Sequence, residues 1–186
     1  NLADTGGGDR DDGYTLAINF SGTSLNEDKF LDFVLQELDK FDPLPGSICF
    51  EITETAAISN LQRVAHFMSE VKKRGCEFSL DDFGSGLSSF AYLKNLHVDY
   101  LKIDGGLVRD ILSDPVDHAM VRAINKLGQL LGKETIAEFV ETTEVAHELR
   151  KIGVNYMQGN AFAIPQSLED YTQVMGPRLV LVGQQQ

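Results

Sequence analysis

Six short apolar segments alternate with longer amphipathic segments along most of the chain. The apolar segments predict strands over 15–21, 47–53, 76–82, 100–104, 134–140 and 156–162. Between them, apolar residues recur at helical spacing, which predicts helices over 30–38, 60–73, 117–131 and 142–152. Strands that alternate with helices form a parallel sheet with helical crossovers. We therefore expect an α/β fold.

The spacing of the strands narrows the choice of α/β architecture. A length of 186 residues shared among six βα units gives 31 residues for each unit. Eight such units need about 250 residues, the usual size of a (β/α)8 barrel. The sequence thus predicts about six of the eight units of a TIM-like barrel. An open doubly wound sheet fits the same count, although no GxGxxG or Walker A motif supports a nucleotide-binding version of it.

Composition excludes several classes of protein. The chain carries 28 acidic and 16 basic residues, a net charge of −12, which argues against non-specific binding to DNA or RNA. No run approaches the roughly 18 apolar residues that a membrane span needs, and no secretory signal opens the chain. Cys49 and Cys76 lie in predicted strands, so we expect buried free thiols in a reducing cytoplasm. The domain is expected to be cytoplasmic, alone or as the cytoplasmic part of a membrane-anchored protein.

The two ends of the chain differ from the alternating region. Residues 1–13 are polar and rich in glycine, which predicts a flexible N-terminal segment. The barrel domain is expected over 14–176, and a C-terminal tail over 177–186. Within that tail, the apolar residues 179–182 leave two alternatives open, a last strand or an interface patch.

Polar residues lie at the carboxyl end of every predicted strand. In chain order they are Asn19, Glu51 with Glu54, Asp81 with Asp82, Lys102, Glu138 and Gln158. The carboxyl ends of the strands of a parallel barrel converge on one mouth, where active sites lie. Carboxylates within apolar strands cost several kcal/mol unless they are paired or bind a metal ion. The pattern therefore predicts a functional site at this mouth.

The chemistry of these residues indicates a divalent metal site. Oxygen donors without a convergent His or Cys favour Mg²⁺ or Mn²⁺ over Zn²⁺. Consecutive strand residues point to opposite faces, so Asp81 and Asp82 can share a site only where the backbone turns, and the sequence FGSG supplies that turn. Asp81 is then expected to bridge two metal ions, with Asp82 on the second. Two metal ions can activate a water and clamp a phosphate during in-line displacement.

Each residue also has a purely structural interpretation. An Asp-Asp pair before a glycine turn is usually a solvated loop, and a single strand lysine is usually an ion-pair partner. Glu54 and Glu141 fit the capping of a following helix as well as they fit a site. Structural or surface positions are expected for His66, His97, His118 and His147, and packing positions for Phe83 and Phe90. A polar or ionisable side chain at the end of each of the six strands nevertheless favours a functional site.

Five segments resemble successive motifs of the EAL domain family of cyclic di-GMP phosphodiesterases. They are FEITET, LDDFGSGLSSFAYLKNL, VDYLKID, TIAEFVET and QGNAFAIP, and the resemblance runs from about Tyr14 to about Tyr171. It implies a TIM-like barrel, typically a homodimer, that hydrolyses cyclic di-GMP to pGpG with Mg²⁺ or Mn²⁺, two ions per site. It also implies bacterial second-messenger signalling, with a GGDEF or sensory domain elsewhere in the protein.

The resemblance implies a role for each of the strand-end residues. Lys102 would orient the attacking water and counter developing charge, and Glu138 would act as general base or metal ligand. Gln158 would hold a water or the substrate near the metal ions. Glu54 would steady the loop over 82–88, which in the family couples the metal site to the dimer interface. The metal ligands would be Asn19, Glu51, Asp81 and, on the second ion, Asp82.

The sequence departs from the family pattern in three places. It lacks the Glu-Ala-Leu motif, so the first two βα units, with a substrate-binding arginine, are expected to precede Asn1. The open sheet edges would be covered by a dimer partner or a neighbouring segment. Phe139 stands where the family usually has glycine, and its side chain would either crowd the metal site or pack outward. QGNAFAIP departs from the usual QGY-F--P, which puts substrate contacts near Asn160 in question.

These departures keep a second function open beside the enzyme. The alternative is a catalytically inactive EAL-type domain that binds cyclic di-GMP as a sensor. A third alternative is a barrel fragment that acts mainly in dimerisation or partner contacts.

Overall fold

The computed structural model describes residues 3–4, 15–27, 29–86 and 90–164. The described residues form two compact units. The N-terminal unit comprises 15–27, 29–79 and 91–98, and the C-terminal unit comprises 3–4, 80–86, 90 and 99–164. Strand β4 (Glu77–Phe83) begins in the first and ends in the second.

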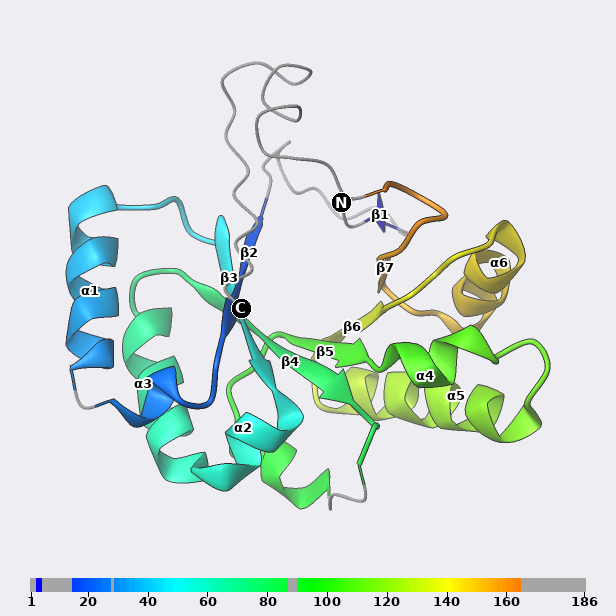
Figure 1. Ribbon diagram of the computed structural model, residues 1–186, viewed down its shortest axis with the longest axis horizontal. Helices are drawn as coiled ribbons and strands as arrows, with labels where there is room; N and C mark the ends of the chain where they lie inside the picture. The colour runs from blue at the N-terminus through cyan, green and yellow to red at the C-terminus, as the bar shows by residue number, and fades with distance from the viewer. Residues whose placement is uncertain (1–2, 5–14, 28, 87–89, 165–186) are drawn as a thin grey trace. The chain divides into compact units, whose positions relative to one another are not determined.

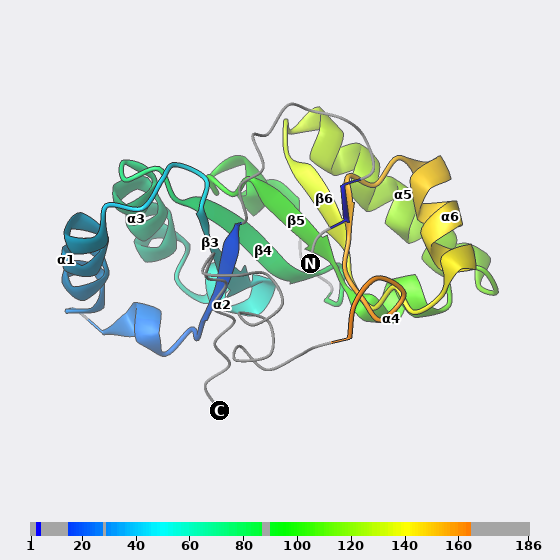
Figure 2. The ribbon, with the colours of Figure 1, turned by 90° about the horizontal axis from the view of Figure 1, so that it is seen from above.

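The N-terminal unit is a small parallel sheet with helices on one side. β3 (Ile48–Thr53) pairs in parallel with β2 (Leu16–Phe20), and the start of β4 lies on the other side of β3. Helices α1 and α3 lie side by side next to these strands, as Figures 1 and 2 show. The helical segments of this unit are η1 (Ser24–Asn26), α1 (Phe30–Phe41), α2 (Glu54–Ser59), α3 (Leu61–Lys72) and most of η2 (Phe90–Lys94).

Phenylalanine rings form the core between these strands and helices. The rings of Phe20 and Phe50 on neighbouring strands are stacked, with centroids 4.6 Å apart. Phe67 from α3 meets Phe20 edge-on at 5.5 Å and Phe78 of β4 at 6.0 Å. Edge-to-face and offset contacts of this kind add to the stabilisation from burial. The cluster holds α3 against the sheet and so fixes the ends of β2 and β3.

The C-terminal unit contains four parallel strands and one short antiparallel strand. Their order is β1-β7-β6-β5-β4, with β5 (Tyr100–Ile103), β6 (Glu134–Ala137) and β7 (Tyr156–Met157). β1 (Ala3–Asp4) pairs antiparallel with β7. The helices of this unit are α4 (Gly105–Arg109), α5 (Pro115–Leu130) and α6 (Thr143–Ile152). Figure 2 shows α5 and α6 on the same side of β5 and β6.

A buried polar network joins α5 to β6 and α6. Thr135 donates to Asn125 Oδ1 at 2.6 Å, and Asn125 Nδ2 donates to the Ile152 carbonyl at 3.0 Å. Asn155 Oδ1 accepts from the backbone N–H of Thr135 at 3.0 Å. Buried polar groups are stable only when they are hydrogen-bonded, so the network fixes how the two helices pack on β6.

The predicted elements are confirmed, most of them with shorter bounds, whereas α1 extends to Phe41 and α5 begins at Pro115. All six strands and the four helices are present, and the α/β fold with parallel strands is as expected. The sequence pattern missed α2 and α4, which are too short to show a helical period. β1 lies within 1–13, which the sequence predicted as a flexible segment. The predicted tail at 177–186, with the apolar residues 179–182, lies outside the described residues. No described helix is both long enough and apolar enough to cross a membrane.

Threonines, rather than the glutamates named above, cap the helices that follow β3 and β6. Thr53 Oγ1 accepts from the N–H of Ala56, and Thr142 Oγ1 accepts from the N–H of Val145. The N-cap hydrogen bonds are therefore made by Thr53 and Thr142 and not by Glu54 or Glu141, while Glu54 lies in the first turn of α2, where a negative charge suits the helix N-terminus. The cap requires an acceptor on the residue just before the helix, and Glu54 is already the first helical residue.

Candidate active site

Lys102 lies between two carboxylates in the C-terminal unit. Its Nζ atom is 2.8 Å from Asp81 Oδ1 and 2.8 Å from Glu138 Oε1. Lys102 is 3% exposed and belongs to β5, all four of whose residues are buried. Asp81 lies near the carboxyl end of β4, and Glu138 directly follows β6. Three adjacent parallel strands thus bring these side chains to one edge of the sheet, as the sequence predicted.

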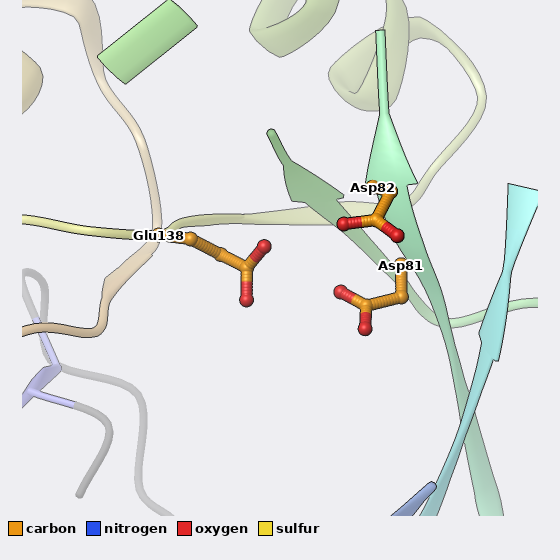
Figure 3. A group of neighbouring side chains, drawn as sticks. All are labelled: Asp81, Asp82 and Glu138. Carbon is orange, nitrogen blue, oxygen red and sulfur yellow. The ribbon is translucent and has the colours of Figure 1, made fainter. Parts of the chain in front are cut away.

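Asp82 joins the same group. One carboxylate oxygen from each of Asp81, Asp82 and Glu138 lies within 4.8 Å of the other two. Figure 3 shows the Glu138 carboxylate directed toward the two aspartates. Asp82 has φ = 56°, a left-handed conformation that Asp tolerates better than most residues. This conformation breaks the strand alternation, so both aspartates contribute to one carboxylate group.

The carboxylate group carries more negative than positive charge. Burial raises the pKa of Asp82, and the neighbouring charges of Asp81 and Asp104 raise it further, while Lys102 acts in the opposite direction. One ammonium thus faces several carboxylates. Hard oxygen donors with excess negative charge match the preferences of Mg²⁺ and Mn²⁺. The group formed by Asp81, Asp82 and Glu138 could therefore hold a divalent cation.

The position of Glu138 is set by the segment after β7. Gln158 N–H donates to the Ala137 carbonyl at 2.8 Å, and Val140 N–H donates to the Gln158 carbonyl at 3.0 Å. Gly159 makes this close approach feasible, since a Cβ atom there would lie 2.4 Å from the backbone of Val140. Backbone hydrogen bonds thus hold the chain on both sides of Glu138. The side chain of Gln158 itself is exposed.

Phe139 packs against α4. Its φ is 52°, the left-handed region that glycine adopts readily. A Cβ atom on Gly105 would lie 2.0 Å from Phe139 Cδ2, so the ring occupies the space that a side chain at position 105 would fill. The Glu138 carboxylate remains within 2.8 Å of Lys102 beside this ring. Of the two alternatives, outward packing describes the observed arrangement.

Asn19 and Glu51 lie in the N-terminal unit, where they are register partners of β2 and β3. Register partners on parallel strands project from the same face of the sheet, so an amide and a carboxylate lie side by side near the ends of these strands. Glu51 is buried, whereas Asn19 is exposed. Two further oxygen donors, both named from the sequence, thus occupy matching positions on neighbouring strands.

Glu54 lies in the N-terminal unit with a partner that sequence reasoning missed. Tyr92 donates its hydroxyl to Glu54 Oε1 at 2.7 Å, and Glu54 is 4% exposed. Burial and the hydrogen bond to Glu54 raise the pKa of Tyr92 far above its ordinary value, so the phenol stays protonated. Tyr92 lies in η2, away from any strand end, and no local pattern marks it.

Asp104 is a second residue that the sequence reasoning did not single out. It caps α4 by accepting from Gly106 N–H at 2.9 Å, and its charge acts on Asp82. The sequence Asp-Gly-Gly directly after a strand is the local signal that could have found it.

The remaining sequence predictions concern histidines, cysteines and aromatics. His118 pairs with Glu148 at 3.0 Å between α5 and α6, and among the described residues no His or Cys joins the carboxylate group. Cys49 and Cys76 are buried free thiols, as expected. Phe83 is fully buried, while the side chain of Phe90 lies outside the described part of the structure.

The sequence matches the EAL domain family over residues 2–165. It is 41% identical over 166 residues to the cyclic di-GMP phosphodiesterase PdeB of Shewanella oneidensis, covering 89% of this chain and 19% of that protein. It is 36% identical over 157 residues to the cyclic di-GMP phosphodiesterase PdeF of Escherichia coli, covering 84% of this chain and 21% of that protein. The chain thus spans about a fifth of the length of these curated relatives.

Solved structures with similar folds come from the same family. The PaMucR phosphodiesterase in complex with c-di-GMP has a TM-score of 0.79 and 32% identity, covering 84% of this chain and 64% of that one. The EAL domain of Mycobacterium smegmatis DcpA has a TM-score of 0.79 and 32% identity, covering 90% of this chain and 75% of that one. These matches confirm the predicted fold class, a partial TIM-like α/β barrel.

Proposed function

The chain belongs to the EAL domain family, and from this we propose that it forms part of a metal-dependent phosphodiesterase that hydrolyses cyclic di-GMP to pGpG. The observation that carries the proposal is the position of Lys102 between Asp81 and Glu138, beside Asp82. A buried lysine within a group of carboxylates suits the handling of a phosphate ester, whose negative charge must be countered. The names of the relatives PdeB and PdeF point to the same substrate.

Two divalent ions, Mg²⁺ or Mn²⁺, would occupy the site in this proposal. When bound, they would lower the pKa of the attacking water and counter the charge of the phosphate. The carboxylates of the C-terminal unit supply the hard oxygen donors and the excess negative charge that such ions require. The residues that would hold the ions are Asn19, Glu51, Asp81 and Asp82.

Lys102 and Glu138 would carry the catalytic step. Glu138 would accept a proton from the attacking water as the water oxygen bonds to phosphorus. The ester oxygen would leave with the electron pair of the broken P–O bond and take a proton from solvent water. The Lys102 ammonium, 2.8 Å from Glu138 Oε1, would hold that carboxylate in place and counter the charge that develops on the phosphate. Glu138 could alternatively serve as a metal ligand, since its carboxylate lies in the same group as Asp81 and Asp82.

Gln158 and Glu54 would support the site. The backbone of Gln158 forms hydrogen bonds with Ala137 and Val140, which flank Glu138 in the chain. The exposed side chain of Gln158 would therefore position a water or the substrate near Glu138. Glu54, held by the Tyr92 hydroxyl, would steady the loop after β4. Both roles follow the family resemblance rather than a contact with a ligand.

Incubation of the chain with cyclic di-GMP and Mn²⁺, followed by chromatography, tests the proposal. We expect a pGpG product that EDTA abolishes and that Glu51→Ala reduces at least 100-fold. Glu144→Ala, which changes a glutamate in the first turn of α6, is the matched control and should retain turnover. Product that persists in EDTA, or in Glu51→Ala, would contradict the site assignment.

A binding function without catalysis is the second candidate. Phe139 motivates it, because a bulky residue in left-handed conformation directly follows Glu138 where the family usually has glycine, although its ring packs against α4. One structure similar to this chain is a FimX EAL domain from Pseudomonas aeruginosa bound to c-di-GMP, with 28% identity and a TM-score of 0.76 over 82% of this chain and 62% of that one. Saturable binding of cyclic di-GMP without any product, with intact metal binding, would support this candidate over the enzyme.

The proposed setting is a larger signalling protein in the bacterial cytoplasm. The relative MucR of Pseudomonas aeruginosa is named as a bifunctional diguanylate cyclase and cyclic di-GMP phosphodiesterase, so a GGDEF or sensory domain is the proposed neighbour. Free buried thiols agree with a reducing compartment. A homodimer is the proposed assembly, and sedimentation of the chain with and without cyclic di-GMP tests it.

A further inference from the structure

Phe139 adopts a left-handed backbone conformation, which is unfavourable for a residue other than glycine. Its φ of 52° places Cβ close to the following carbonyl oxygen, a clash that glycine avoids. The conformation is imposed by the hydrogen bonds that Ala137 and Val140 make with Gln158. Strained residues that are kept beside a reactive group point to a functional role. The question is therefore what the aromatic ring does at this position.

The ring is fixed on one side by α4. It covers Gly105, where no side chain could fit, and the guanidinium carbon of Arg109 lies 5.8 Å from the ring centroid. Gly105 and Arg109 are four residues apart, and positions with that spacing share one face of a helix. Helix α4 thus forms a shallow seat that holds the ring in a defined orientation.

Burial does not account for the ring, because 53% of Phe139 is exposed. The contact with Gly105 leaves part of the ring accessible, and the guanidinium of Arg109 lies over the ring. This combination of a held ring and an exposed surface is typical of positions that stack on nucleic-acid bases.

Phe139 is the next residue after a member of the carboxylate group. Phe139 directly follows Glu138, whose carboxylate pairs with Lys102. Its seat, Gly105, directly follows Asp104, whose charge acts on Asp82. Phe139 and Gly105 are therefore each the neighbour in sequence of a residue that belongs to the carboxylate group or acts on it.

We propose that Phe139 stacks on a guanine base of the substrate and so contributes to selection of a dinucleotide over other phosphodiesters. This inference rests on the proposed function, because it names the part of the substrate that the exposed ring contacts. Cyclic di-GMP carries a purine within a few bonds of each phosphate, so a base and a phosphate can occupy neighbouring positions of one site. Removal of a stacking side chain weakens nucleotide binding by about tenfold or more.

Steady-state kinetics of Phe139→Leu and Phe139→Tyr test the proposal with two substrates. The first is cyclic di-GMP and the second is bis(p-nitrophenyl) phosphate, a phosphodiester without a nucleobase, each with Mn²⁺. Leu keeps an apolar side chain and the left-handed strain but lacks the aromatic face, whereas Tyr keeps the face. We expect the ratio of kcat/KM for cyclic di-GMP to that for the base-free ester to fall about tenfold in Phe139→Leu, through KM, and to be restored in Phe139→Tyr.

Two outcomes would overturn the proposal. An equal loss with both substrates in Phe139→Leu would mean that the ring merely positions Glu138. An unchanged ratio would mean that the exposed face contacts no base. If the native chain hydrolyses neither substrate, the proposed phosphodiesterase activity fails, but stacking by Phe139 is still tested. Equilibrium binding of cyclic di-GMP to the two variants then decides whether Phe139 stacks on a base. Weaker binding by Phe139→Leu than by Phe139→Tyr would support stacking, and equal binding would reject it.

Discussion

The Nζ atom of Lys102 lies 2.8 Å from Oε1 of Glu138, and the same Nζ lies 2.8 Å from Oδ1 of Asp81. The lysine comes from the middle of a buried strand, whereas each carboxylate lies at or just after the end of a neighbouring strand. A buried ion pair stabilises a fold only when its geometry compensates for the loss of solvation. Here the arrangement leaves a net negative group, which suits a site that binds cations better than it suits a structural salt bridge.

Replacing Lys102 tests whether the ammonium serves the site. We expect Lys102→Met to lower kcat at least 100-fold, within the range for loss of a group that assists proton transfer or counters charge. We also expect the free energy of unfolding without metal to fall by about 3–5 kcal/mol, because two partly buried carboxylates lose their counter-charge. Urea unfolding in EDTA and initial rates with cyclic di-GMP measure the two effects.

Lys151→Met is the matched control for that substitution. Lys151 is 2.9 Å from Glu148 but its side chain is 58% exposed, so the change should alter stability by less than about 1 kcal/mol and leave kcat unchanged. Normal turnover by Lys102→Met would show that Lys102 takes no part in catalysis.

Asp82→Asn tests the excess of negative charge. The folded-state pKa of Asp82 is raised, mainly by burial and then by Asp81 and Asp104. Ionised Asp82 therefore destabilises the metal-free fold at neutral pH, and this penalty disappears as the pH falls through its folded pKa. We expect Asp82→Asn to raise Tm in EDTA at pH 7 while it reduces the Tm increase that Mg²⁺ causes.

The size of the Mg²⁺ effect follows from mass action. A ligand at 100 times its Kd stabilises the fold by about 2.7 kcal/mol. Asp117 is the matched control, because burial and its neighbours Asp114 and Asp110 also raise its pKa, on α5. Asp117→Asn should keep the full Mg²⁺ shift. The proposed ligand assignment fails if Asp82→Asn responds to Mg²⁺ as the native chain does.

Tyr92→Phe measures the hydrogen bond to Glu54. The substitution deletes the 2.7 Å bond to a carboxylate that is 4% exposed. Hydrogen bonds to charged groups contribute about 1.5–3 kcal/mol, and we expect a loss of this size in urea unfolding. Tyr156→Phe, which removes a longer 3.2 Å bond to the half-buried Glu134, should cost less. Equal losses of unfolding free energy in Tyr92→Phe and Tyr156→Phe would show that burial of Glu54 does not strengthen its hydrogen bond with Tyr92.

The thiol of Cys76 should be unreactive in the folded chain. Burial raises its pKa to about 11, from 9.0 for an unperturbed thiol. At pH 8 about one folded molecule in a thousand then carries a thiolate, against about one in ten unfolded molecules. Because the unfolded thiol ionises first, Cys76 also lowers stability as the pH rises from about 9 to 11.

Labelling with a thiol reagent at pH 8 measures this difference. In a Cys49→Ala background we expect Cys76 to react only as fast as the fold opens, and at once in 6 M guanidinium. Rapid labelling of the folded chain would contradict the buried, protonated thiol.

Local sequence patterns were enough to predict the α/β fold and the strand-end residues. Strands and helices of ordinary length show their own periods, so 47–53 and 117–131 were placed within a few residues of β3 and α5. The grouping of Asp81, Lys102 and Glu138 could be predicted because parallel strands bring their carboxyl ends to one edge whatever their side chains are. A short helix such as α4 has too few residues to show a period, and its start at Asp104 was therefore missed.

Only the tertiary structure decided the features that depend on contacts between distant residues. The partnership of Tyr92 with Glu54 joins two segments that share no pattern. The left-handed conformations of Asp82 and Phe139 oppose the local preference of most residues, and at Phe139 the hydrogen bonds to Gln158 impose the conformation. The seat of the Phe139 ring on Gly105 likewise requires two strand ends to meet before either residue acquires its role. Periodicity is a property of a segment, whereas such contacts exist only once the segments have packed.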